Sequence, residues 1–161
     1  LDKRIDVIAA AIRFGATVYD LEETELCYAP PYSSAKDPVN MAAYTAGNIL
    51  SGAVDNITAD ELKELKDAVI LDVRTKAERD KGYIEGSINI PVDSLRERLS
   101  ELDKDKTYVV HCAVGLRSYI AARILKQNGF KNVKNLAGGY TTYRTAIKDY
   151  TWSGANEKKT Y

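Results

Sequence analysis

Short apolar runs alternate with helix-like segments along residues 58–150, and this alternation constrains the fold more than any other feature of the sequence. Residues 68–72 and 107–111 are nearly continuous apolar runs, as in strands that a parallel sheet buries on both faces. Residues 87–90 and 132–136 predict two further strands. Strands that alternate with helices in this way form parallel sheets covered on both sides. The sequence therefore predicts an α/β fold, a parallel sheet flanked by helices.

The helices between these strands carry their own start signals. Thr58 and Glu61 have the spacing of a capping box, which predicts a short helix after Thr58. Further helices are predicted at residues 75–81, 92–102, 118–128 and 140–149. The segment 92–102 carries valine and leucine at three- and four-residue spacing, which is typical of an amphipathic α-helix.

The first 52 residues precede this pattern and differ from it. Residues 2–14 place isoleucines on one helical face, and Asp37 followed by Pro38 predicts the start of a second helix, running to about residue 50. This segment is too small for a core of its own, although it is rich in apolar and aromatic side chains. We expect it to pack either on the α/β domain or on a part of a larger protein.

The predicted organisation has four parts. Residues 1–52 form an N-terminal helical appendage, residues 53–57 a linker, residues 58–150 the α/β domain, and residues 151–161 a polar tail. The chain begins with Leu1 and not with Met, so we expect it to have been cut from a longer protein or processed.

Composition excludes several classes of function. Twenty-three basic and 23 acidic residues give zero net charge, which favours neither nucleic acid nor an anionic membrane as a partner. No apolar stretch approaches the roughly 18 residues of a transmembrane helix. Two distant cysteines, Cys27 and Cys112, and a single histidine provide no metal-binding spacing and no disulfide framework. We therefore expect a cytoplasmic, reducing setting in which a lone thiol stays available.

Cys112 directly follows a predicted buried strand, at the end where open α/β sheets bind ligands. Gly115 allows the following loop to curl, so that backbone N–H groups point inward. Those groups, the next helix N-terminus and Arg117 should form an electropositive cradle that lowers the pKa of the thiol. Such a cradle would also stabilise a persulfide or a bound oxyanion. The alternative is a buried, inert cysteine, but the positions of Gly115 and Arg117 favour a reactive one.

Four motifs resemble those of the rhodanese family, over roughly residues 58–144. They are residues 71–74 with Glu78, residues 82–91, residues 111–118 and residues 136–140. The resemblance implies that Cys112 takes a sulfane sulfur from a donor, holds it as a persulfide and passes it to a thiol acceptor. It also implies that the loop side chains and amides bind the substrate: Ala113, Val114, Gly115, Leu116 and Arg117.

The same resemblance implies supporting roles for four residues around the loop. Asp72 and Arg74 match positions that brace it, and His111 and Ser118 flank it. A plain strand-end salt bridge between Asp72 and Arg74 is compatible with that role. Many family members carry a basic residue where Ala113 stands here. The missing charge favours a less charged donor than thiosulfate, such as a polysulfide or a low-molecular-weight persulfide.

Two other functions are compatible with the motifs. Cysteine-dependent phosphatases and arsenate reductases also use a cysteine and a terminal arginine, but their loop has one more residue. The six residues from Cys112 to Arg117 match the sulfurtransferase length. A non-catalytic rhodanese fold used for protein interaction is the other alternative, which the intact cysteine, glycine and arginine disfavour.

Residues 2–9 and 28–40 resemble the end of the dimerisation domain of coenzyme A disulfide reductases, which are pyridine nucleotide-disulfide oxidoreductases. This resemblance implies a longer parent that uses FAD, NAD(P)H and coenzyme A, whereas the present chain should hold no cofactor by itself. Its implied partners are the parent's reductase domains and a second copy of the chain. Tyr28 would then reach the redox cysteine of the partner subunit, or serve as an interface aromatic, and Cys27 would be a packing residue.

Overall fold

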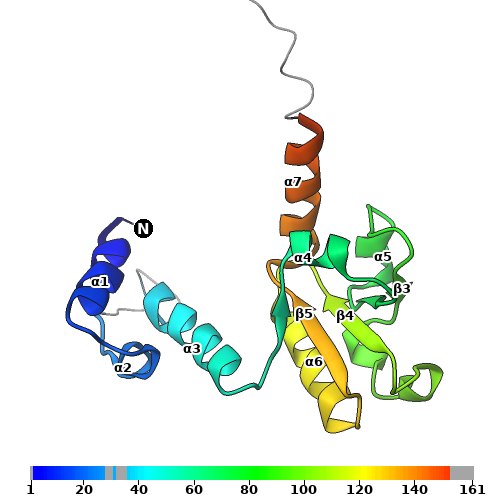
Figure 1. The fold of residues 1–161 in the computed structure, drawn as a ribbon, viewed down its shortest axis with the longest axis horizontal. Coiled ribbons are helices and arrows are strands. Elements are labelled where there is room, and N and C mark those ends of the chain that lie inside the picture. The colour runs from blue at the N-terminus through cyan, green and yellow to red at the C-terminus, as the bar shows by residue number, and fades with distance from the viewer. Residues whose placement is uncertain (1, 28–30, 32–35, 153–161) are drawn as a thin grey trace, which may run out of the picture. The chain divides into compact units, whose positions relative to one another are not determined.

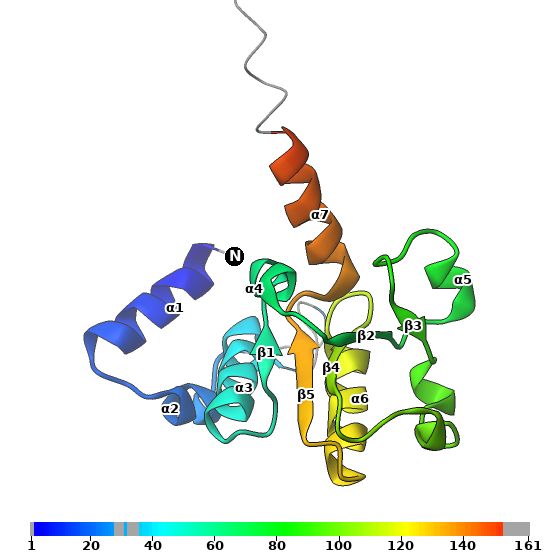
Figure 2. The ribbon, with the colours of Figure 1, turned by 45° about the vertical axis from the view of Figure 1, so that its right-hand side comes forward.

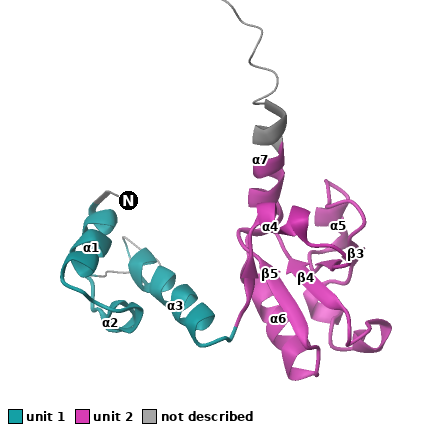
Figure 3. Cartoon of the chain, viewed as in Figure 1, with its two compact units in different colours: residues 1–53 teal, residues 54–161 magenta. Residues whose placement is uncertain are grey.

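A computed structural model describes residues 2–27, 31 and 36–152 of the chain (Figure 1). The chain divides into two compact units, residues 1–53 and residues 54–161 (Figure 3). Each unit has its own internal packing. Among the described residues, none of the helices has the length and apolar character needed to cross a membrane.

The first unit is helical: α1 spans Asp2–Arg13, α2 spans Val18–Glu23 and α3 spans Pro38–Leu50. Packing of both α1 and α2 against α3 holds the unit together. The side-chain amide of Asn40 on α3 donates to the carbonyl oxygens of Leu21 (3.0 Å) and Thr24 (2.9 Å). These bonds satisfy the carboxyl end of α2, so a buried polar side chain fixes that helix on α3.

The helix starts in this unit follow capping chemistry. Asp37 accepts a hydrogen bond from the N–H of Val39 and Pro38 is the first residue of α3, as predicted. Helix α2 was not predicted, although Thr17 and Asp20 form a complete capping box at its start. Six residues are too few to show a helical period, and contacts with α3 stabilise the turn instead.

The second unit contains a five-stranded, all-parallel sheet in the order β1-β5-β4-β2-β3 (Figure 2). Its strands are Asn56–Ile57 (β1), Val69–Asp72 (β2), Ile88–Asn89 (β3), Thr107–His111 (β4) and Asn132–Leu136 (β5). The predicted α/β fold with its parallel sheet is confirmed. The expected linker at 53–57 contains β1, which is too short to predict from periodicity and which pairs with β5.

Helices cover both faces of this sheet: α4 (Ala59–Glu64), α5 (Lys76–Arg79), α6 (Leu116–Gln127) and α7 (Gly139–Trp152). Side chains of β4 alternate between two cores. Tyr108 and Val110 pack with the buried face of α6, whereas Val109 packs with residues of α4 and α7. This period of two, on a strand with both faces buried, explains why its sequence is a continuous apolar run.

The α-helix predicted at residues 92–102 is not formed. Two 3₁₀ turns stand there instead, η1 (Val92–Ser94) and η2 (Leu99–Glu101), closed by hydrogen bonds between residues three apart. Leu95 and Leu102 are nevertheless buried in the core beside α6. The spacing of these leucines correctly predicted that both are buried. It did not predict the backbone, because two 3₁₀ turns bury the two side chains as well as one α-helix would.

Candidate active site

The candidate site lies at the carboxyl ends of β2 and β4, which are neighbours in the sheet. Their register pairs Asp72 with His111, and the N–H of Val73 donates to the carbonyl oxygen of His111 at 2.9 Å. Cys112 is the next residue after β4. The sheet therefore brings the segment of Asp72 and Arg74 beside the Cys112 loop, as the resemblance to rhodaneses implied.

The Cys112 side chain is buried and surrounded by hydrogen-bond donors. Its Sγ accepts a hydrogen bond from the N–H of Gly115 at 3.1 Å, and the Ser118 hydroxyl lies 3.6 Å away. The Ser118 hydroxyl also lies 2.9 Å from the carbonyl oxygen of Gly115, to which it can donate its hydrogen bond in place of the sulfur. Gly115 has φ +123°, a backbone conformation that residues with a Cβ rarely adopt, so glycine at this position permits the curl of the loop.

These donors determine the ionisation of the thiol. Burial raises the pKa of Cys112, but hydrogen bonds from the Ser118 side chain and from the N–H groups of Gly115, Ser118 and Val114 lower it by more. The net pKa of Cys112 is below its ordinary value. The loop therefore favours the thiolate, the form that attacks sulfur and carbon electrophiles.

The first turn of α7 holds the other side of the loop. The N–H of Tyr140 donates to the carbonyl oxygen of Cys112 at 2.8 Å, and the N–H of Thr141 donates to that of Ala113 at 3.0 Å. A Cβ atom at Gly139 would stand 2.7 Å from the Cys112 carbonyl oxygen, and φ there is +59°. Only glycine allows this close approach, so Gly139 lets the start of α7 contact the loop.

Asp72 and Arg74 form a buried ion pair beneath the site. Nε and Nη2 of Arg74 both donate to the Asp72 carboxylate, the latter at 2.7 Å, and Arg74 also donates to the carbonyl oxygen of Gly82 at 2.9 Å. Burial raises the pKa of Asp72, but its hydrogen bonds to Arg74 hold that pKa below the ordinary value. The Arg74 guanidinium lies 4.3 Å from the ring centre of Tyr140. Asp72 and Arg74 thus position the segment that touches the loop, without an Arg74 hydrogen bond to Cys112.

His111 is fully buried between the two carboxyl-end motifs. Burial lowers the pKa of His111 more than the Asp72 carboxylate raises it, so the ring is neutral at pH 7. One ring nitrogen, Nδ1, lies 3.4 Å from the Cys112 carbonyl oxygen. The other, Nε2, lies 3.9 Å from Asp72 Oδ2 and has no hydrogen-bond partner among the described residues. His111 contacts the loop through the main chain and supports it there.

Arg117 is bound to a carboxylate that the sequence analysis did not assign to the site. Its Nη1 and Nη2 donate to the two oxygens of Glu78 at 2.8 and 2.6 Å. Hydrogen bonding from Arg117 lowers the pKa of Glu78 to about 2, and the same pair raises that of Arg117. The sequence predicted a helix at residues 75–81, but not that Glu78 in this helix pairs with an arginine 39 residues further along the chain.

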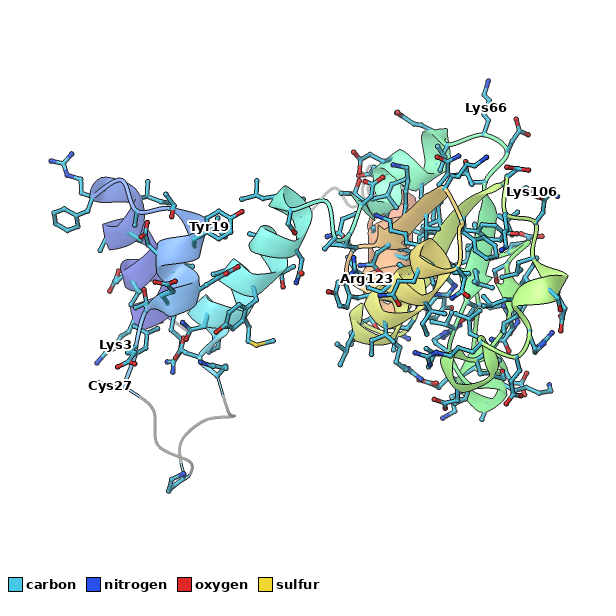
Figure 4. All side chains as sticks on the ribbon, turned by 90° about the horizontal axis from the view of Figure 1, so that it is seen from below. Lys3, Tyr19, Cys27, Lys66, Lys106 and Arg123 are labelled. Atoms are coloured by element: carbon cyan, nitrogen blue, oxygen red, sulfur yellow. The ribbon has the colours of Figure 1, made fainter. Side chains whose placement is uncertain are left out.

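The remaining loop side chains form an uncharged rim. Val114 and Leu116 are 68% and 69% exposed, and Ala113 is half-buried. The side chains at the mouth of the loop are therefore apolar, whereas backbone N–H groups face the Cys112 thiol inside. Tyr28, the predicted reductase-site residue, lies outside the described residues. Cys27 is exposed in the first unit and so does not pack within it (Figure 4).

Comparison with known proteins agrees with this geometry. Residues 58–146 match the family described as rhodanese-like domain. A sulfurtransferase from Allochromatium vinosum is 37% identical over 81 residues, which are 50% of this chain and 76% of that protein. The matched span contains the whole candidate loop.

Two solved structures extend the similarity to most of the chain. The crystal structure of reduced Bacillus anthracis CoADR-RHD has a TM-score of 0.87 and 49% identity, covering 92% of this chain and 27% of that one. A NAD-dependent persulfide reductase from A. fulgidus has a TM-score of 0.76 and 50% identity, covering 88% of this chain and 25% of that one. The chain thus spans about a quarter of each of these larger proteins. On its matched span and on the site described above, the chain belongs to the rhodanese-like domain family.

Proposed function

We propose that the second unit is a sulfurtransferase that carries sulfane sulfur as a persulfide on Cys112. The observation that supports this most is the buried Cys112 thiol, whose Sγ faces the N–H of Gly115 and the hydroxyl of Ser118. The same donors that favour a thiolate would stabilise the anionic outer sulfur of a persulfide. A sulfurtransferase among the relatives of this domain supports the same chemistry.

The reaction has two balanced steps. The Cys112 thiolate attacks the outer sulfur of a persulfide donor R–S–SH; the new S–S bond forms, the old one breaks, and the donor leaves as the thiolate RS⁻. A thiolate acceptor then attacks the outer sulfur of Cys112–S–SH, becomes a persulfide itself and releases the Cys112 thiolate. No net oxidation occurs, and the sulfur moves without an external reductant.

The donor class is part of the proposal. Ala113 places no charge beside the thiol, and the exposed rim contributes Val114 and Leu116. A polysulfide or a low-molecular-weight persulfide suits such a mouth better than the doubly charged thiosulfate does. The acceptor is proposed to be a thiol because attack by a thiolate regenerates Cys112 directly.

We further propose that the parent protein is a coenzyme A disulfide or polysulfide reductase. Its other domains would bind FAD, NAD(P)H and coenzyme A, and no residue of this chain is assigned to hold them. Support comes from the similarity of both units to CoADR-RHD and to a NAD-dependent persulfide reductase. The reductase domains and a second copy of the chain are the proposed partners, with Tyr28 near the partner's redox cysteine. A cytoplasmic setting, which keeps Cys112 reduced, is part of the same proposal.

Intact mass spectrometry of the chain tests the sulfurtransferase. After incubation with thiosulfate, polysulfide or coenzyme A persulfide, we expect one added sulfur atom that Cys112→Ser abolishes. The matched control is Cys27→Ser, which removes the exposed cysteine and should keep the adduct. No adduct with any donor would contradict the proposal. Turnover of an aryl phosphate would then favour the phosphatase. If the chain forms no persulfide and turns over no aryl phosphate, the non-catalytic interaction module is favoured.

The relay in the parent has a separate test. In the full-length protein, Cys112→Ser should abolish sulfide release from the sulfane donor while leaving NAD(P)H-dependent reduction of coenzyme A disulfide intact. Unchanged sulfide release would contradict the relay from Cys112 to the flavin domains.

A further inference from the structure

The cation at the end of the candidate loop is already bound by a carboxylate. Both Nη atoms of Arg117 donate to the two oxygens of Glu78, at 2.8 and 2.6 Å. This fork-to-fork arrangement uses the donors with which an arginine would otherwise bind an oxyanion. Both side chains remain about one-third exposed, so the pair lies at the mouth of the site and not in the core.

Helix α5 fixes the Glu78 side chain in this position. Its Oε2 accepts hydrogen bonds from the N–H and the hydroxyl of Thr75, both at 3.0 Å, as the second half of a capping box. The carboxylate is therefore held by its own helix and by Arg117 at once. Hydrogen bonding from Arg117 keeps the pKa of Glu78 at about 2, so the carboxylate stays charged throughout the physiological range.

The other arginines near the loop are also paired. Arg74 Nη2 lies 2.7 Å and Arg79 Nη1 3.5 Å from the same oxygen of Asp72, which is fully buried. Arg79 further donates to the hydroxyl and carbonyl oxygens of Ser87. In the described part of the site, each of these arginines thus has a carboxylate neighbour. What the loop offers an incoming anion free of a carboxylate neighbour is therefore its backbone N–H groups.

We propose that Glu78 is a specificity-determining residue: by holding Arg117, it makes the site prefer persulfide donors, whose leaving group is a thiolate, over thiosulfate, whose leaving group is the sulfite dianion. This inference rests on the proposed sulfurtransferase function. With thiosulfate, the Cys112 thiolate would attack the outer sulfur and release sulfite, so a doubly charged group must stay bound while its S–S bond breaks. With R–S–SH the leaving group is a single thiolate, which needs no free guanidinium.

The test replaces Glu78 by glutamine, which keeps the side-chain size and an oxygen that can accept from Thr75. The measured quantity is the second-order rate constant for persulfide formation on Cys112, followed by intact mass, with thiosulfate and with glutathione persulfide as donors. For Glu78→Gln we expect the thiosulfate constant to rise about tenfold, since one guanidinium becomes free for the anion. The glutathione persulfide constant should stay within about twofold.

Two further variants separate specificity from structure. Arg117→Ala in the Glu78→Gln background should cancel the gain, because the freed cation would be gone. Thr75→Ala removes one of the bonds that hold the carboxylate but keeps its pair with Arg117, so it should shift the ratio of the two rate constants less than Glu78→Gln does.

Glu101→Gln is the matched control for loss of a charge. Glu101 forms an equally short, exposed, two-pronged pair with Arg98, at 2.7 and 2.6 Å, in the turn η2. It should leave both rate constants within about twofold of the wild type. A switch of donor preference in Glu101→Gln would overturn the inference.

The possible failures can be told apart. If the wild type forms no persulfide with either donor, the proposed function is overturned and this inference with it. If the wild type forms the Cys112 persulfide but Glu78→Gln keeps the same donor ratio, the inference alone is overturned. A gain with thiosulfate that persists in the Glu78→Gln, Arg117→Ala double variant would also contradict it.

Discussion

The carbonyl oxygen of Cys112 accepts a hydrogen bond from the N–H of Tyr140 at 2.8 Å, so the last helix of the domain holds the candidate loop through its main chain. The bond is possible because Gly139, one residue earlier, has no side chain to separate the two segments. The position of the Cys112 backbone therefore depends on residues far along the chain.

Replacing Gly139 by alanine should disturb this contact more than backbone strain alone would. A Cβ there would meet the Cys112 carbonyl oxygen at 2.7 Å, and we expect a loss of roughly 2–3 kcal/mol in the free energy of unfolding, with slower persulfide formation. Gly86→Ala is the matched control, because φ is +75° there and its Cβ would meet nothing within 4 Å. Urea denaturation measures the loss in unfolding free energy of both variants. Equal losses would show that backbone strain alone, and not the contact with Cys112, accounts for the effect.

Ser118→Ala should raise the pKa of Cys112. The wild-type pKa lies below its ordinary value because hydrogen bonds to the thiolate outweigh burial. Removing one of them should move the pKa upward, because the hydrogen bond from Ser118 stabilises the charged thiolate. The thiolate fraction at neutral pH then falls, and alkylation slows.

The measurement is the pH profile of iodoacetamide alkylation, made in a Cys27→Ser background because Cys27 is exposed and would react too. Ser94→Ala serves as the control, because the hydroxyl of Ser94 donates to the carbonyl oxygen of Pro91 and not to the Cys112 sulfur. An unchanged midpoint in Ser118→Ala would mean that the backbone N–H groups alone set the ionisation of Cys112.

Asp72→Asn should be strongly destabilising. It leaves the Arg74 guanidinium buried, with 4% of its side chain exposed, and without its charged partner. Breaking a buried pair in this way typically costs about 3–5 kcal/mol in the free energy of unfolding. Asp60→Asn breaks the exposed pair with Lys63 and should cost roughly 0.5 kcal/mol or less. Similar urea midpoints for the two variants would refute a structural role for the Asp72–Arg74 pair.

The Glu78–Arg117 pair should add a pH-dependent contribution to stability. The pKa of Glu78 falls from 4.5 to about 2 on folding, so the stabilisation is complete above pH 4.5 and is lost as the pH falls towards 2. Because the two side chains are about one-third exposed, solvent screening limits it to roughly 1 kcal/mol.

Urea unfolding of the wild type and of Glu78→Gln at several pH values measures this contribution. The difference in unfolding free energy between them should be largest at neutral pH and shrink steadily below pH 4.5. Glu101→Gln, which breaks a more exposed pair, should show a smaller change. A difference that is constant with pH would mean that the Glu78 carboxylate is not linked to folding.

Strand β4 and the loop after it could be predicted because their signals are local. A continuous apolar run specifies a strand buried on both faces, and Cys112, Gly115 and Arg117 follow it directly in the sequence. The short strand β1 could not be predicted, since two residues carry no period. It forms because β5 and the residue after it offer hydrogen bonds, such as that from the N–H of Ala137 to the carbonyl oxygen of Ile57.

The same distinction applies within the site. The short helix at residues 75–81 was predicted from local sequence, yet the use of the Glu78 carboxylate depends on Arg117, which only the tertiary fold brings near. Likewise, the spacing of the apolar residues in 92–102 showed that Leu95 and Leu102 are buried but not which backbone path buries them. Local patterns specify burial and caps; long-range pairings and turn types depend on packing.

The pairing of β1 with β5 makes the first and last strands of the second unit neighbours at one edge of the sheet. The helices that follow these strands, α4 and α7, are also in contact. The sheet is therefore complete only when the beginning and the end of the unit's sequence are both present. The elements that form and hold the loop at Cys112 all belong to this unit. The unit would therefore carry the complete site when a linker joins it to another protein.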